Sequence, residues 1–133
     1  MLDPSIDQSL IAIVDDERSV RRGLSNLLKS EGYLTECFPS GESFLASDQH
    51  AKFDFLILDV KLGGVDGFEV RQHLADSGVD IPVIFVSAVG DELTRKRALG
   101  SGAISFFHKP IDVDALLGDI HATLVGRGDA NEE

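Results

Sequence analysis

The sequence contains little cysteine and few basic residues. Cys37 is the one cysteine among 133 residues, which excludes an internal disulfide and leaves no cysteine cluster for zinc. This composition favours a reducing compartment and predicts a cytoplasmic protein, with Cys37 as a small core residue. The chain has 12 basic and 23 acidic residues, which gives a net charge of −11. Because this charge repels the phosphate backbone of DNA and RNA, we expect no direct nucleic acid binding by this chain.

Long apolar runs are also missing. No segment approaches the roughly 18 apolar residues of a membrane span. Residues 1–9, MLDPSIDQS, carry acids where a signal peptide has basic and apolar blocks. We therefore expect no association with a membrane. A chain of 133 residues that is 43% hydrophobic and 26% charged has the size and composition of one globular domain.

Short apolar runs alternate with segments of helical period along the chain. Five runs predict strands, at 10–14, 33–38, 55–58, 82–86 and 103–107. Most of them are apolar at successive positions, which is typical of parallel strands covered on both faces, while the mixed second run favours a place nearer the sheet edge. Apolar residues at helical spacing predict helices at 20–28, 44–45, 68–74, 91–99 and 116–124.

This alternation predicts a doubly wound α/β domain with right-handed crossovers and helices on both faces of a parallel sheet. In such folds the ligand site lies at the carboxyl ends of the strands. Residues 126–133, GRGDANEE, predict a linker or a disordered end. We therefore expect one domain over residues 1–125, with its core at about 8–124.

Polar residues follow four of the predicted strands, namely Asp15-Asp16-Glu17, Asp59, Ser87 and Lys109. Two carboxylates about 4 Å apart repel by roughly 4 kcal/mol at an effective dielectric near 20, so such a group needs a cation or a raised pKa. Mg²⁺ takes oxygen ligands and commonly joins carboxylates to a phosphate. The set predicts a phosphoryl site in which Asp59 is the nucleophile and Lys109 and Ser87 bind the phosphoryl oxygens.

Five short motifs, in order along the chain, resemble the receiver domain of two-component response regulators. They are VDDE at 14–17, LILD at 56–59, DG at 66–67, VSA at 86–88 and FFHKP at 106–110. The resemblance covers about residues 8–124. It implies a (βα)5 flavodoxin-like receiver fold with a parallel five-stranded sheet in the order 2-1-3-4-5.

The resemblance implies a phosphoacceptor and a metal site. Asp59 is the residue that accepts the phosphoryl group. Asp15, Asp16, Asp59 and the backbone carbonyl of Lys61 hold Mg²⁺, for which Mn²⁺ is an alternative ion.

It also implies a set of residues that respond to the phosphate. Ser87 is the switch hydroxyl, and the backbone N–H of Ala88 binds a phosphoryl oxygen. Lys109 senses the phosphate, Phe106 is the switch aromatic, and the peptide bond before Pro110 is cis.

The resemblance further implies a switch and not an enzyme. A sensor histidine kinase or a histidine phosphotransfer protein donates the phosphoryl group. The face formed by the fourth helix (91–99), the fifth strand (103–107) and the fifth helix (116–124) then changes its affinity for a second copy or an output partner. Arg95, Lys96 and Arg97 either pair with acids across such an interface or form a solvated face.

Several plainer interpretations remain open from the residues alone. Asp15 and Asp16 also suit a helix cap, and Phe106 also suits the core. Asp66 is expected to cap a helix that begins at Gly67. A phosphohydrolase with an aspartyl nucleophile is the alternative function, although such enzymes need a second acid where this chain has Lys61. The chain is either a stand-alone receiver or part of a longer regulator.

Overall fold

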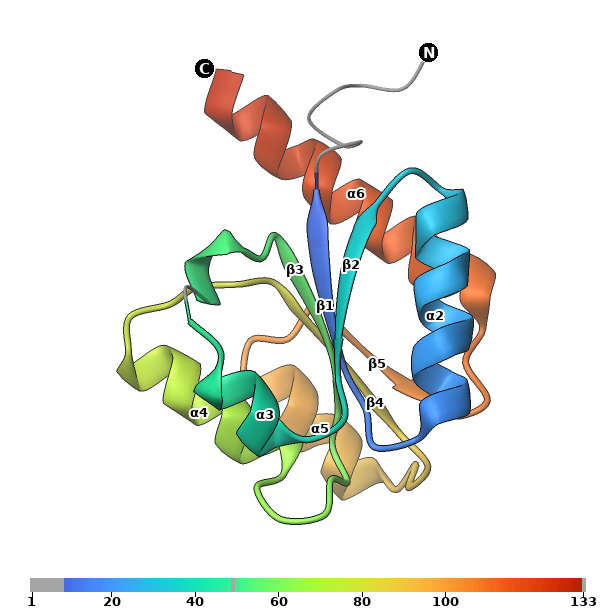
Figure 1. The fold of residues 1–133 in the computed structure, drawn as a ribbon, viewed down its shortest axis with the longest axis vertical. Helices are drawn as coiled ribbons and strands as arrows, with labels where there is room; N and C mark the ends of the chain where they lie inside the picture. The colour runs from blue at the N-terminus through green and yellow to red at the C-terminus, as the bar shows by residue number, and fades with distance from the viewer. Residues whose placement is uncertain (1–8, 49, 133) are drawn as a thin grey trace.

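Five parallel strands form one sheet in the order β2-β1-β3-β4-β5 (Figure 1). The computed structural model describes residues 9–48 and 50–132, with side chains through residue 126. The strands are β1 (Leu10–Val14), β2 (Leu34–Phe38), β3 (Phe55–Asp59), β4 (Val83–Ser87) and β5 (Ser105–His108). The predicted doubly wound (βα)5 fold and its strand order are confirmed, and the mixed second run is an edge strand.

Helices cover both faces of this sheet (Figure 1). On one face lie α2 (Arg18–Ser30) and α6 (Val113–Glu132), and on the other lie α3 (Gly41–Ala46), α4 (Gly67–Asp76) and α5 (Glu92–Gly100). A short 3-10 helix, η1 (His50–Lys52), precedes β3. The expectation of a linker or disordered end from Gly126 is wrong, because the backbone continues as α6 to Glu132. Within the described residues, no helix is both long enough and apolar enough to cross a membrane.

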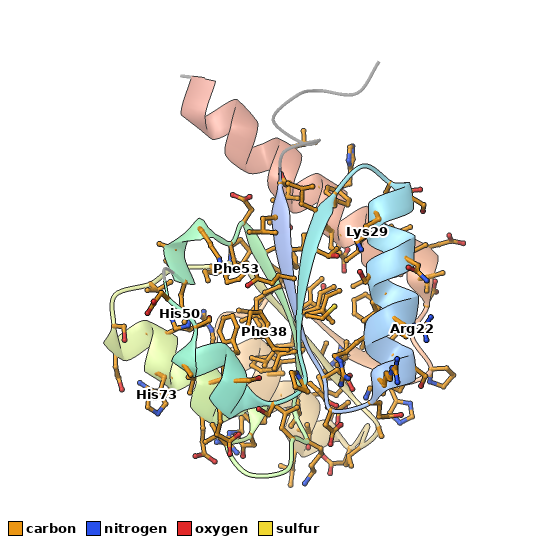
Figure 2. The ribbon with its side chains drawn as sticks, in the orientation of Figure 1. Arg22, Lys29, Phe38, His50, Phe53 and His73 are labelled. Carbon is orange, nitrogen blue, oxygen red and sulfur yellow. The ribbon has the colours of Figure 1, made fainter. Side chains whose placement is uncertain are left out.

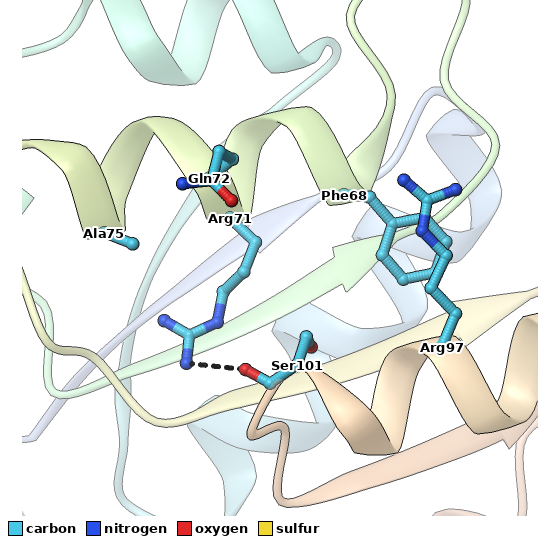
Figure 3. Close-up of a pocket in the computed structure, with 6 residues that line it drawn as sticks. All are labelled: Phe68, Arg71, Gln72, Ala75, Arg97 and Ser101. Carbon is cyan, nitrogen blue, oxygen red and sulfur yellow. Dashed lines mark hydrogen bonds between the residues drawn. The ribbon is translucent and has the colours of Figure 1, made fainter.

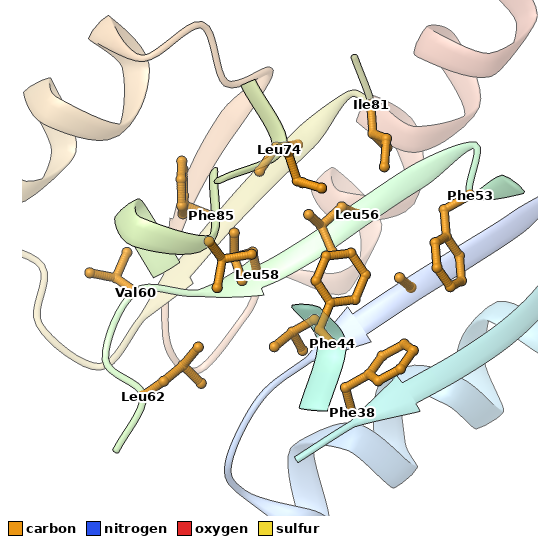
Figure 4. Close-up of a cluster of buried hydrophobic side chains, with 14 of the residues drawn as sticks. Phe38, Phe44, Phe53, Leu56, Leu58, Val60, Leu62, Leu74, Ile81 and Phe85 are labelled. Carbon is orange, nitrogen blue, oxygen red and sulfur yellow. The ribbon is translucent and has the colours of Figure 1, made fainter. Parts of the chain in front are cut away.

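The sheet separates two hydrophobic clusters because successive side chains of a strand point to opposite faces. Ile11 and Ile13 of β1 pack toward α2 and α6, while Ala12 and Val14 belong to the cluster under α3, α4 and α5. Figure 4 shows part of this second cluster. All five residues of β3 are buried, as expected for a central parallel strand.

Aromatic side chains fill the second cluster near β2. The rings of Phe38 and Phe44 meet edge to face with centroids 5.2 Å apart, and Phe53 lies 6.0 Å from Phe38. His50 of η1 stacks on Phe44 with ring centroids 4.8 Å apart. Figure 2 shows His50, Phe38 and Phe53 on the same side of the sheet. These contacts position α3 and η1 against the sheet.

The ends of the strands and one core assignment differ from the sequence prediction. Asp59 and Ser87 are the last residues of β3 and β4 and do not follow them, and β5 extends to His108. The prediction of Cys37 as a core residue is wrong, because its side chain is exposed on the edge strand β2. Leu34 of the same strand is 52% exposed, so an apolar residue type on this strand does not indicate burial.

Gly67 begins α4 where its backbone approaches β3, and Asp66 caps the helix as predicted. A Cβ at Gly67 would overlap the carbonyl oxygen of Asp59. We expect Gly67→Ala to lower the free energy of unfolding by about 1–3 kcal/mol, because the backbone must shift. Gly63→Ala is the control, since no atom lies within 4 Å of its added Cβ. Urea denaturation compares the variants, and equal stability of the two would contradict this close approach.

Candidate functional site

Three carboxylates surround the ammonium group of Lys109. Its Nζ lies 2.9 Å from Asp15 Oδ2, 2.9 Å from Glu17 Oε1 and 3.0 Å from Asp59 Oδ2. Asp15 and Asp59 are buried, whereas Glu17 is exposed at the rim. The carboxyl ends of β1 and β3 and the end of β5 therefore meet at one edge of the sheet, as the alternation of strands and helices predicts.

Backbone hydrogen bonds orient the two buried carboxylates. Asp59 Oδ1 accepts a hydrogen bond from the Lys61 N–H at 3.0 Å, and Asp15 Oδ1 accepts one from the Glu17 N–H at 2.8 Å. Such turns form because an aspartate side chain can bond the backbone two residues further on. Each carboxylate therefore uses one oxygen to hold its own loop and turns the other oxygen toward Lys109.

Burial and charge shift the ionisation of this ion pair. Burial raises the pKa of Asp59, the hydrogen bond from Lys109 lowers it, and the Asp15 carboxylate raises it again, to about 6 overall. Burial lowers the pKa of Lys109, but the hydrogen bonds to Glu17, Asp15 and Asp59 outweigh burial and raise it above its ordinary value. Lys109 therefore stays charged at neutral pH, and three carboxylates share its single positive charge.

The same carboxylates form a candidate metal site. Asp15, Asp16, Glu17 and Asp59 each offer one carboxylate oxygen, and these oxygens lie within 4.8 Å of one another. Within the described chain, Asp15 Oδ2 is buried and has no hydrogen-bond partner beyond its ion pair with the ammonium group. A set of oxygen donors with excess negative charge fits a hard divalent cation such as Mg²⁺. The participation of the Lys61 carbonyl stays a prediction.

The predicted switch residues lie on β4 and β5. Ser87 is the buried last residue of β4, and its Oγ accepts a hydrogen bond from the Val89 N–H at 3.0 Å. Ala88 begins the exposed loop that follows. Phe106 pairs with Phe85 of the neighbouring strand and packs, partly buried, against the cluster beneath α3, α4 and α5. Phe106 therefore contacts the core and also lies two residues before the end of β5.

Two residues of this region have no assigned role in the sequence analysis. Glu17 bonds the Lys109 ammonium, and the signal that points to it is its place as the third acid after β1. His108 lies with its Nε2 atom 3.0 Å from Ala88 O, and no sequence pattern predicts this contact. The cis peptide bond before Pro110 is present, as the resemblance implies.

A separate pocket of about 230 Å³ lies between α4 and α5 (Figure 3). It is lined by Phe68, Arg71, Gln72, Ala75, Arg97 and Ser101. The Arg97 guanidinium stacks over the Phe68 ring at 4.1 Å, and Arg71 donates a long hydrogen bond of 3.4 Å to Ser101 O. None of the residues predicted for the phosphoryl site lines this pocket.

Comparisons with known proteins identify the family of this chain. The family model of the response regulator receiver domain matches residues 11–121, so the chain belongs to this family. Response regulator protein TodT of Pseudomonas putida is 40% identical over 116 residues, which are 87% of this chain and 51% of that protein. The chain thus spans about half the length of the curated relatives it matches.

Solved structures give the same assignment. The response regulator StyR is 36% identical with a TM-score of 0.81, over 93% of this chain and 64% of that chain. A receiver protein from Pseudoalteromonas atlantica is 28% identical with a TM-score of 0.82, over 89% and 98%. The chain is a receiver domain of the two-component response regulators, and the phosphohydrolase alternative is not favoured.

Proposed function

We propose that Asp59 accepts a phosphoryl group from the phosphohistidine of a histidine kinase or a histidine phosphotransfer protein. A lone pair of an Asp59 carboxylate oxygen forms the new bond to phosphorus, and the bond from phosphorus to the histidine nitrogen breaks. The observation that carries this proposal is a buried carboxylate at the end of β3 with the Lys109 ammonium 3.0 Å away. An ammonium held there offsets negative charge on the phosphoryl oxygens during transfer.

The proposal includes Mg²⁺, with Mn²⁺ as an alternative, held by Asp15, Asp16, Asp59 and the backbone carbonyl of Lys61. When bound, the ion supplies positive charge that reduces the repulsion between a carboxylate nucleophile and the phosphoryl oxygens. The excess negative charge at the site, where Asp15, Asp16, Glu17 and Asp59 bring carboxylate oxygens within 4.8 Å of one another, supports this assignment. Glu17 has a different role and holds the Lys109 ammonium at the rim, at 2.9 Å.

In this proposal four residues respond to the charge gained by Asp59. Lys109 and the backbone N–H of Ala88 bind phosphoryl oxygens. Ser87 Oγ gives up its hydrogen bond from the Val89 N–H and turns toward the phosphoryl group. This movement frees space for Phe106, whose ring has no hydroxyl, so packing alone selects its rotamer. The two arrangements define a population shift.

The output surface in this proposal is the face formed by α5, β5 and α6, which binds a second copy or another partner. Four apolar side chains stand exposed on or beside these elements: Leu93, Leu99, Ile104 and Val113, with Leu93 81% exposed. Exposed apolar side chains of this kind suit an interface. Arg95 pairs within α5 and Arg97 stacks on an aromatic ring, so both already have partners inside this chain.

We propose a switch and not a turnover enzyme. Phosphohydrolases that resemble the haloacid dehalogenase family need a second acid two residues after the nucleophile, where this chain has the exposed Lys61. Without that acid, the only reactions we expect are phosphorylation of Asp59 and slow loss of its phosphate.

We also propose that the protein is located in the cytoplasm.

Incubation with Mg²⁺ and acetyl phosphate, followed by intact-mass spectrometry, tests the proposal. We expect an adduct of one phosphoryl group, which excess EDTA prevents. Asp15→Asn should raise the Mg²⁺ concentration for half-maximal labelling at least about tenfold, because it removes an anionic donor.

Asp76→Asn is the matched control, because Asp76 lies at the exposed end of α4, 2.8 Å from the Gln72 amide. It should label like the wild type. Labelling that needs no divalent cation would contradict the metal assignment. A wild-type protein that forms no adduct at any Mg²⁺ concentration would overturn the role of Asp59.

A further inference from the structure

Residues 108 and 109 together hold both peptide groups that flank Ala88. The Lys109 N–H donates to Ser87 O at 2.8 Å, and His108 Nε2 lies 3.0 Å from Ala88 O. A carbonyl oxygen can only accept a hydrogen bond, so Nε2 of His108 carries the proton. One dipeptide at the end of β5 therefore fixes the start of the β4–α5 loop through two hydrogen bonds.

Gly90 provides the space for the imidazole ring. A Cβ at Gly90 would overlap His108 Cδ2 and lie 3.0 Å from Nε2. The backbone of Gly90 does not have a positive φ, so no left-handed turn requires a glycine here. The glycine is needed because the His108 ring lies so close to the loop backbone. The loop backbone and the ring of His108 therefore fit together only because this residue has no side chain.

These two hydrogen bonds set the direction of the Ala88 N–H. In a trans peptide the C=O and the N–H point in opposite directions within one plane. The bond from Lys109 to Ser87 O therefore fixes the plane that contains the Ala88 N–H. The bond from His108 to Ala88 O fixes the next plane, so that Ala88 is held on both sides.

We propose that His108 is a positioning residue for phosphoryl transfer, which holds Ala88 so that its N–H meets a phosphoryl oxygen. This inference rests on the proposed phosphorylation of Asp59. With acetyl phosphate, an Asp59 oxygen bonds to phosphorus, and the bond from phosphorus to the acetate oxygen breaks, so that acetate leaves with the electron pair. A donor that is already oriented stabilises the developing charge without reorganisation.

The test compares labelling rates of the wild type, His108→Leu, His108→Gln and Gly90→Ala at saturating acetyl phosphate. His108→Leu should lower the maximal rate about three- to tenfold, the effect of one lost hydrogen bond. The Mg²⁺ concentration for half-maximal labelling should stay unchanged, because the His108 side chain contacts no carboxylate of the cluster. His108→Gln should restore most of the rate, since its amide N–H can reach the same carbonyl.

Gly90→Ala approaches the same contact from the other side. It should displace the ring and slow labelling, and adding it to His108→Leu should cause little further loss, because both changes remove one interaction. The amide resonance of Ala88 in the unphosphorylated protein provides a second readout. It should shift in His108→Leu and in Gly90→Ala, and return toward its wild-type position in His108→Gln.

Each outcome decides between the two proposals. A wild type that forms no adduct overturns the role of Asp59 and this inference with it. A wild type that labels normally while His108→Leu labels at the same rate overturns the inference alone. Equal slowing by His108→Leu and His108→Gln also overturns it, because loss of the ring and not of the hydrogen bond would then be responsible.

Discussion

Asp59→Asn will abolish the phosphoryl adduct that the wild type forms with Mg²⁺ and acetyl phosphate. The amide that replaces the carboxylate has no anionic oxygen with which to attack phosphorus. Asp59 is 2% exposed, with one oxygen bonded to the Lys61 N–H and the other to the Lys109 ammonium. An asparagine keeps the size of this side chain, so the loss reports chemistry and not a change of fold.

The control for this experiment is Asp114→Asn, which makes the same chemical change at an exposed residue in the first turn of α6. It should label at the wild-type level. Intact mass and a thermal denaturation curve for each variant separate a missing nucleophile from a missing fold. A full-sized adduct on Asp59→Asn, mapped by peptide digestion to Asp15 or Asp16, would show that another carboxylate is the acceptor.

The same variant will be more stable than the wild type at neutral pH when no metal is present. The pKa of Asp59 is raised from 3.8 to about 6, chiefly by burial, so the folded state holds a proton that the unfolded state releases. Stability from this group is fully present below the unfolded pKa and is lost as pH rises through the folded pKa. Between about pH 4.5 and about pH 7.5, the free energy of unfolding of the wild type therefore falls by about 2 kcal/mol through Asp59. Asp59→Asn does not undergo this loss.

Urea denaturation in EDTA across this pH range measures the difference between the two proteins. The other carboxylates titrate in both, so the difference isolates Asp59. We expect the advantage of Asp59→Asn to grow with pH and to level off above about pH 7. If the difference in free energy of unfolding between the two proteins were the same at every pH, Lys109 would compensate the Asp59 charge fully. The pKa of Asp59 would then not be raised.

The acidic cluster can be predicted from sequence because parallel strands have a fixed direction. Once five buried runs alternate with helices, the carboxyl ends of all strands must meet at one edge, and Asp15, Asp59 and Lys109 follow from that geometry. Residue type and position along the chain carry this information. The distances between these side chains require the structure, because turns and burial set them.

Other features depend on contacts that a residue type does not encode. His108 meets Ala88 only because Gly90, two residues further along the same loop, leaves space for its ring, and residue type alone does not indicate this contact. Cys37 has a side chain typical of cores, yet its strand lies at the sheet edge, where this side chain is exposed. Residues after Gly126 have a polar composition, and the helix nevertheless continues because the preceding turns are anchored by Leu116, Ile120 and Leu124.

The position of Asp59 within the sheet limits how this domain can respond to a change in charge. Asp59 pairs with Val86, the next residue donates its N–H to Val86 O at 2.9 Å, and Gly67 closes the turn onto Val60 O at 3.0 Å. The proposed acceptor is thus fixed to a fully buried central strand, which leaves its backbone little room to move when it gains charge. Any displacement must occur in loops and in side chains such as Ser87 and Phe106, so local order should change at the rim while the backbone of the sheet stays as it is.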